Sequence, residues 1–202
     1  MTRTPTDAST ARIHSKNTTT TRRTALLAMA AVVLVATGAL TAASATGDDD
    51  HQVAIVAGGC FWGMEHLLRD LDGVIDTDVG YTADRTDKKS KPAETVRLLF
   101  DPERITYEEI LRFYFRIHDP TTMNRQGNDM GAKYRSAIFV LDDEQRQIAE
   151  QVRAEVDASG FWKKPVVTLI SDAGPFEEAP EGHQDYLIKK PGGYTCHYER
   201  GE

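Results

Sequence analysis

The sequence predicts an α+β fold, with helices packed against a mixed β-sheet in two layers. Apolar segments with the character of strands alternate along the chain with segments whose apolar residues recur at helical spacing. Some neighbouring strand segments have no helix between them, which favours hairpins over a doubly wound parallel sheet. The length of 202 residues and the hydrophobic fraction of 40% suit one domain with an appendage.

Five segments have the apolar composition of strands. In chain order they are 52–57, 74–81, 95–100, 136–141 and 166–171. The segment 82–92 is polar, rich in Lys and without periodicity, so it is interpreted as a loop. The segment 118–134 is a longer loop, rich in Asn, Gln and Gly. Loops of this length inside compact domains are often functional.

Helical spacing is found at four places. They are 61–70, 106–117, 142–159 and a short stretch at 184–190. Thr106 and Glu109 form a capping-box pattern at the start of the second helix, and Gly160 marks the end of the third. Before the first helix, Gly58-Gly59 permits a sharp turn. That turn places Cys60 at or near a helix N-terminus.

The N-terminal 45 residues differ in composition from the rest. A region rich in Thr, Ser and Arg ends at Arg22-Arg23, an Ala-, Leu- and Val-rich stretch follows at 24–43, and Ala43-Ser44-Ala45 offers a cleavage site between small residues. This order predicts a cleaved export signal of the twin-arginine kind, although Ala25 stands where that motif favours a large apolar residue. An uncleaved membrane anchor is the alternative, since residues 24–43 are about long enough to span a bilayer.

The sequence thus divides into a signal at 1–45, a linker at 46–51 and a domain at 52–202, and we expect that domain to be periplasmic or extracellular. Residues 1–45 contain five of the 24 Lys and Arg residues and one of the 31 acidic residues, so the remainder has a net charge of −11. This acidic balance argues against a nucleic-acid partner and against binding to anionic membrane surfaces.

The two cysteines, Cys60 and Cys196, allow two interpretations. In an exported protein they could form a structural disulfide, or they could be a catalytic pair. A helix N-terminus lowers the pKa of a thiol, but position alone leaves Cys60 as well explained by core packing. The C-x-x-C pattern of a general thiol-disulfide oxidoreductase is absent from the sequence. The cysteines and histidines show no zinc-site spacing either.

Several motifs stand in order along the chain. They are Gly58-Gly59-Cys60-Phe61-Trp62-Gly63-Met64-Glu65, Gly80-Tyr81-Thr82, 124–131 (NRQGNDMG), 134–139 (YRSAIF), 183–186 (HQDY) and 193–197 (GYTCH). Over roughly residues 53–198 the chain resembles peptide methionine sulfoxide reductase type A. The resemblance implies that family's fold, a ferredoxin-like core with a coiled C-terminal tail. It also implies thiol-dependent reduction of methionine S-sulfoxide, in proteins and as the free amino acid.

The resemblance implies roles for individual residues. Cys60 would attack the sulfoxide sulfur, and Glu94, a carboxylic acid beside aromatic walls, would protonate the oxygen. Tyr81 and Tyr134 would hydrogen-bond that oxygen.

The remaining substrate-binding residues frame this centre. Phe61 and Trp62 would enclose the methyl group in an apolar cage, although the pattern by itself favours ordinary core packing. Asp129 would orient its neighbours. The motif at 183–186 lies at the pocket edge on the family pattern, or serves capping and packing.

The second cysteine completes the cycle that the resemblance implies. Cys196 would condense with the Cys60 sulfenic acid to a disulfide, carried there by the flexible Gly192-Gly193 arm. A thioredoxin-like protein would reduce this disulfide by exchange. No metal or organic cofactor is required, and the family pattern suggests a monomer.

One segment departs from the family. Tyr81 and Glu94 are thirteen positions apart, a shorter stretch than usual, and Lys91-Pro92-Ala93 lacks the family's glycine and histidine. We expect the short loop to open one wall of the pocket. A degenerate reductase that binds without turnover is therefore an alternative, as is a non-enzymatic domain with a structural Cys60–Cys196 disulfide.

Overall fold

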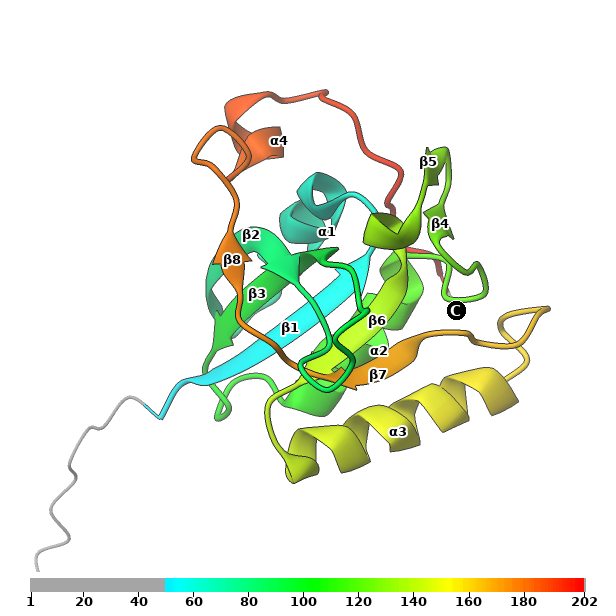
Figure 1. Ribbon diagram of the computed structural model, residues 1–202. Helices are drawn as coiled ribbons and strands as arrows, with labels where there is room; N and C mark the ends of the chain where they lie inside the picture. Colours follow the sequence, from blue (N-terminus) through cyan, green and yellow to red (C-terminus); the bar gives the residue numbers. More distant parts are fainter. Residues whose placement is uncertain (1–49, 202) are drawn as a thin grey trace, which may run out of the picture. The chain divides into compact units, whose positions relative to one another are not determined.

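The computed structural model describes residues 50–201, and it confirms the α+β fold (Figure 1). The predicted export signal, its cleavage site and the alternative anchor at 24–43 lie outside the described residues. Within residues 50–201, no helix is both long and apolar enough to cross a membrane.

Six strands of the described chain form one mixed sheet in the order β7-β6-β1-β3-β2-β8. Neighbouring strands are antiparallel except β6 and β7, which are parallel. The strands are β1 (Gln52–Gly58), β2 (Val74–Thr82), β3 (Ala93–Phe100), β6 (Ser136–Val140), β7 (Leu169–Asp172) and β8 (Glu177–Glu178). A separate ribbon lies in the predicted long loop and consists of β4 (Arg125–Gln126) and β5 (Asp129–Met130).

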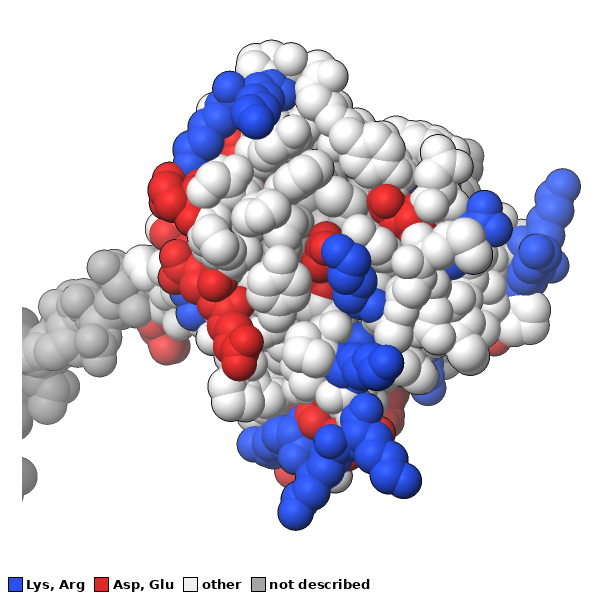
Figure 2. Space-filling model, turned by 45° about the horizontal axis from the view of Figure 1, so that its top comes forward, with Lys and Arg blue, Asp and Glu red and all other residues white. Residues whose placement is uncertain are grey.

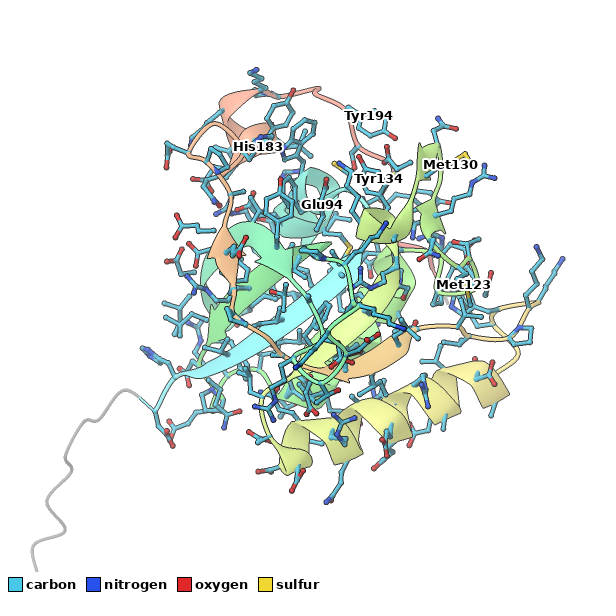
Figure 3. The ribbon with its side chains drawn as sticks, in the orientation of Figure 1. Glu94, Met123, Met130, Tyr134, His183 and Tyr194 are labelled. Atoms are coloured by element: carbon cyan, nitrogen blue, oxygen red, sulfur yellow. The ribbon has the colours of Figure 1, made fainter. Side chains whose placement is uncertain are left out.

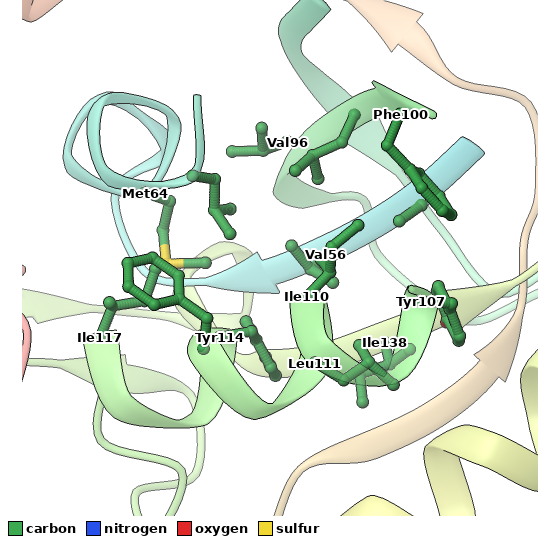
Figure 4. Packing of buried hydrophobic residues seen from close by; sticks show 14 of the residues in the cluster. Val56, Met64, Val96, Phe100, Tyr107, Ile110, Leu111, Tyr114, Ile117 and Ile138 are labelled. Carbon is green, nitrogen blue, oxygen red and sulfur yellow. The ribbon is translucent and has the colours of Figure 1, made fainter. Parts of the chain in front are cut away.

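The helices supply the second layer. They are α1 (Phe61–Leu68), α2 (Tyr107–Ile117), α3 (Asp143–Ala158), α4 (Tyr186–Lys189) and the short 3-10 helix η1 (Ala132–Tyr134). Apolar residues of α1, α2 and α3 join one core with alternate residues of the central strands, such as Val56 and Val96 (Figure 4). The residues between them, such as Ile55, point to the other face and form a smaller cluster. This alternation is the period-two pattern of strands covered on both faces.

The capping box at the start of α2 is confirmed. The Thr106 side chain accepts a hydrogen bond from the Glu109 backbone N–H at 3.2 Å, and the Glu109 carboxylate accepts from the Thr106 N–H at 2.9 Å. Two backbone donors that the first turn leaves free are thereby satisfied. Local chemistry therefore fixes where this helix begins.

Two strands differ from the sequence-based expectation. β7 begins at Leu169 rather than at Val166, because the Val167 N–H donates to the Pro120 carbonyl oxygen at 2.8 Å instead of to β6. The edge strand β8 was not predicted. Its two residues, Glu177 and Glu178, are exposed and pair with β2 through backbone alone, so no apolar pattern marks them.

The end of β1 is held by a buried polar network. The Tyr114 hydroxyl donates to the Ala57 carbonyl oxygen at 2.8 Å and lies 2.9 Å from Ser136 Oγ. His118 Nε2 lies 2.7 Å from the same Oγ. Buried networks whose members are all satisfied make a region rigid. The turn that follows β1 therefore has a fixed base.

Candidate active site

A cavity of about 190 Å³ opens where β1 turns into α1. Its wall combines side chains from α1, β2, β3, β5, η1 and the C-terminal tail (Figure 3). Ten residues line it: Cys60, Phe61, Trp62, Tyr81, Glu94, Asp129, Lys133, Tyr134, His183 and Tyr194. Seven of the eight site residues expected from the sequence thus share one cavity, and the eighth, Cys196, contacts Asp129 behind it.

Aromatic rings form one side of the cavity. The Phe61 ring centroid lies 5.8 Å from that of Tyr81 and 6.4 Å from that of Trp62. Trp62 stacks on Tyr186 at 3.7 Å, and its indole N–H donates to His183 Nδ1 at 3.2 Å. The motif at 183–186 therefore fixes the Trp62 ring as well as packing α4. An apolar wall of this kind suits a methyl group.

Glu94 is held by two donors. It stands opposite Tyr81 in the β2–β3 register and is almost fully buried. One carboxylate oxygen accepts from the Phe61 backbone N–H at 3.3 Å, and the other accepts from Lys133 Nζ at 2.8 Å. The cation and the backbone donor fix the positions of both carboxylate oxygens in the cavity.

The short loop before Glu94 closes without displacing it. The Asp84 backbone N–H donates to Ser90 Oγ at 3.1 Å, and Asp84 forms an antiparallel bridge with Ala173. β3 then pairs with β2 from Ala93 onward. The register of the strands, rather than the length of the loop, places Glu94 in the cavity.

Cys60 caps the N-terminus of α1 and is 6% exposed. Burial raises the pKa of its thiol to about 12; the Trp62 N–H lowers that pKa, while the charges of Glu94 and Asp129 add to the rise. The expected lowering of the pKa by the helix N-terminus is therefore wrong, because desolvation outweighs the backbone donor. The resting nucleophile is a thiol.

Cys196 lies next to Cys60, and both are free thiols. The Cys60 backbone lies close enough to the Cys196 thiol to lower its pKa. The Cys196 thiol also lies 3.4 Å from Asp129 Oδ2, which accepts the Tyr194 hydroxyl at 3.0 Å as well. Burial, followed by Asp129, raises the pKa of Cys196 to about 11.

The C-terminal tail is held by contacts on both sides of Cys196. His197 Nε2 lies 2.8 Å from the Gly58 carbonyl oxygen, and the tail runs on to an ion pair between Arg116 and Glu199 at 3.1 Å. Cys196 follows the expected arm at 192–193 and contacts Asp129, which lines the cavity.

A glycine in α1 makes room for this tail. A Cβ atom on Gly63 would lie 2.2 Å from Thr195 Oγ1 and 2.6 Å from His197 Nδ1. Contacts this short do not occur between unbonded atoms. Gly63 therefore leaves the space against α1 that Thr195 and His197 of the tail occupy; we call this contact the tail seat.

A family model described as peptide methionine sulfoxide reductase matches residues 52–202. The chain belongs to the peptide methionine sulfoxide reductase family. The enzymes named peptide methionine sulfoxide reductase MsrA from Nocardia farcinica and Streptomyces coelicolor are 56% and 54% identical to it. These alignments cover 73% and 74% of this chain, and 89% and 90% of the relatives.

Solved structures of the family share the fold. Mxr1 from Saccharomyces cerevisiae in reduced form has a TM-score of 0.69 at 35% identity, over 75% of this chain and 93% of that one. Methionine sulfoxide reductase A of Corynebacterium diphtheriae has a TM-score of 0.61 at 30% identity, over 77% and 82%. Mxr1 in complex with Trx2 has a TM-score of 0.56 at 29% identity, over 75% and 91%.

Sequence reasoning missed three residues of this reductase site. Lys133 and Tyr194 line the cavity, and each is next in sequence to a residue of the motifs. That proximity in sequence could have predicted them. His197 follows Cys196 in the tail motif, but nothing in the sequence places it against Gly58. Within residues 50–201, no group of three or more His, Cys, Asp or Glu side chains is arranged to hold a metal ion.

Proposed function

We propose that the chain reduces methionine S-sulfoxide to methionine, in proteins and as the free amino acid, with Cys60 as the nucleophile. One observation carries the assignment of the site. The cavity at Cys60 combines an aromatic wall with a buried carboxylate and two tyrosines. The wall suits the methyl group, and the polar groups suit the sulfoxide oxygen.

In the first step, oxygen moves from the substrate sulfur to Cys60, and the residues of this site supply and return the proton. The Cys60 thiol gives its proton to the Glu94 carboxylate, and the sulfur attacks the sulfoxide sulfur. Glu94 passes the proton to the departing oxygen, which ends on Cys60 as a sulfenic acid. The substrate sulfur is reduced by two electrons, and the Cys60 sulfur is oxidised by two. Tyr81 and Tyr134 stabilise the oxygen by hydrogen bonding.

The second step joins the two cysteines. Cys196 condenses with the Cys60 sulfenic acid, water leaves, and a disulfide forms. A thioredoxin-like dithiol protein then reduces the disulfide by exchange. The complex of the similar yeast Mxr1 with Trx2 supports a reductant of this kind.

The surroundings of the cavity suit a protein substrate. Figure 2 shows a largely uncharged face, with acidic side chains along its left margin, a few charged side chains near its centre, and Lys and Arg at its upper left, right and lower margins. Met130 and Tyr194 expose apolar surface near Tyr134 (Figure 3). We infer a repair enzyme that acts under oxidative stress, exported or anchored through its N-terminal segment, and monomeric.

Turnover with each epimer of a methionine sulfoxide substrate tests this function. The full chain, with dithiothreitol as reductant, should form methionine from the S epimer, and the Cys60→Ser variant should form none. Absence of turnover with the S epimer in the wild type would contradict the proposal. Unchanged turnover in the variant would contradict the role of Cys60.

A further inference from the structure

The residue after the resolving cysteine has an unusual position. His197 is buried, and its Nε2 lies 2.8 Å from the Gly58 carbonyl oxygen, directly before the glycine turn that carries Cys60. On the other side of the ring, Nδ1 lies 3.6 Å from Cys196 Sγ. The imidazole thus bridges the strand end behind the nucleophile and the resolving thiol.

The hydrogen bond to Gly58 fixes the tautomer of this ring. A carbonyl oxygen can only accept, so Nε2 carries the hydrogen. Burial lowers the pKa of His197 to about 4, so the ring is neutral near pH 7. A neutral ring with its hydrogen on Nε2 presents a lone pair on Nδ1. That lone pair faces the Cys196 thiol.

Other charged groups around the ring adjust its basicity. Asp129 favours a proton on His197, whereas Arg200 disfavours one, and buried His118 is a second neutral ring nearby. Asp129 is also the competing acceptor for the Cys196 hydrogen, at 3.4 Å. Its Oδ2 already accepts the Tyr194 hydroxyl at 3.0 Å, so the Cys196 thiol would share that oxygen with a second donor. Of the two ring nitrogens of His197, Nε2 bonds Gly58, which leaves Nδ1 to accept the Cys196 hydrogen.

We propose that His197 is the general base that deprotonates Cys196 when the disulfide forms. The step rests on the proposed function, which supplies the Cys60 sulfenic acid. The Cys196 proton moves to Nδ1, the Cys196 sulfur attacks the Cys60 sulfur, and the S–O bond breaks. The proton on Nδ1 joins the leaving hydroxide as water. One S–S and one O–H bond replace one S–H and one S–O bond, so no added oxidant is required.

The base gives the disulfide step a characteristic pH dependence. The pKa of Cys196 is raised to about 11 and that of His197 is lowered to about 4. Between these values the base is free and the thiol carries its proton, so the wild-type rate should be nearly independent of pH. Without the base, only the spontaneously formed thiolate reacts. The rate should then rise about tenfold for each pH unit.

His197→Gln removes the base and keeps a side-chain N–H that can reach Gly58. Thr195→Val is the matched control. Thr195 Oγ1 accepts the His197 backbone N–H at 3.1 Å, so this variant disturbs the tail and keeps the imidazole. Reduced full-length chain is mixed with one equivalent of S-sulfoxide substrate, without reductant. Methionine and the blocked thiols are then quantified over time after acid quenching and alkylation.

At pH 7 we expect His197→Gln to form the disulfide about 100-fold more slowly than the wild type, the lower range for loss of a general base. The rate of disulfide formation in His197→Gln should rise with pH, while the rate in Thr195→Val should stay nearly independent of pH. A rate of disulfide formation that does not change with pH in His197→Gln, whether fast or slow, would overturn the proposal. Either Asp129 would then be the base, or His197 would have a purely structural role. Failure of the wild type to release methionine would instead contradict the proposed function.

Discussion

Lys133 Nζ donates a hydrogen bond to Glu94 Oε1 at 2.8 Å, across the mouth of the cavity that contains Cys60. The Glu94 carboxylate, followed by the Tyr134 hydroxyl, holds the pKa of Lys133 above its ordinary value. The Lys133 side chain is 51% exposed, so solvent screens much of this attraction. The pair nevertheless fixes the position of the Glu94 side chain in the cavity.

Replacing Lys133 by Met should lower kcat/KM for the S epimer. Without the ammonium group, Glu94 Oε1 loses the donor that holds it in the cavity. An ion pair with one exposed partner contributes about 1 kcal/mol or less, so the loss should be about fivefold or less. The measurement is kcat/KM at pH 7, with exposed Lys88→Met as control. An unchanged kcat/KM would show that Lys133 does not position Glu94.

Glu94→Gln tests the proton transfer itself. The amide oxygen can still accept the Phe61 N–H, so the fold and the pocket should persist. Loss of a positioned acid–base group typically costs 10²–10⁴-fold. We expect kcat for the S epimer to fall by about 100-fold or more, with little change in KM. Near wild-type turnover would assign the proton transfer to another group, such as Tyr81 or Tyr134.

Gly63→Ala tests the seat of the tail. The added methyl group would meet Thr195 and His197, so the tail should leave α1, while alanine suits the helix itself. We expect Cys196 to react at least about tenfold faster with an alkylating reagent, because its burial raises its pKa. Gly201→Ala is the control, since nothing lies within 4 Å of its Cβ position. Equal labelling of Cys196 in both variants would rule out this seat.

Glu65 gives the fold a pH-dependent stability. It is 1% exposed, and burial raises its pKa to about 7 although Arg69 and the Asp185 N–H oppose the rise. The folded state therefore binds a proton more tightly than the unfolded state, where the pKa is near 4.5. The contribution of Glu65 to stability should fall as pH rises from about 4.5 to 7, by up to about 3 kcal/mol.

Glu65→Gln should flatten this dependence, because an amide does not ionise. Thermal unfolding at a series of pH values, with exposed Glu144→Gln as the control, measures the effect. The same change in melting temperature through pH 5–7 in the wild type and in Glu65→Gln would contradict this contribution.

Local signals in the sequence predicted most of the fold. Strand periodicity located β1, β2, β3 and β6, and the Thr106 capping box located α2. These features depend on neighbours a few positions apart. β8 escaped prediction because two exposed glutamates join the sheet edge through backbone bonds alone.

The sequence predicted which residues form the site better than it predicted their chemistry. The motifs brought Cys60 and Glu94 together correctly, but the pKa of Cys60 depends on burial by the whole fold. The Lys133–Glu94 bond joins residues 39 positions apart, from η1 and β3. The docked tail likewise depends on contacts of His197 with Gly58, 139 positions away. Such pairings follow from tertiary packing.

The most direct test of the account follows the oxygen atom in the Cys196→Ser chain. This variant is given S-sulfoxide substrate without reductant, and the products are analysed by mass spectrometry with a sulfenic-acid trap. We expect one methionine per chain, with a single oxygen added at Cys60 and trapped there as sulfenic acid. Methionine formed without oxidation at Cys60, or no methionine from the S epimer, would contradict Cys60 as the nucleophile.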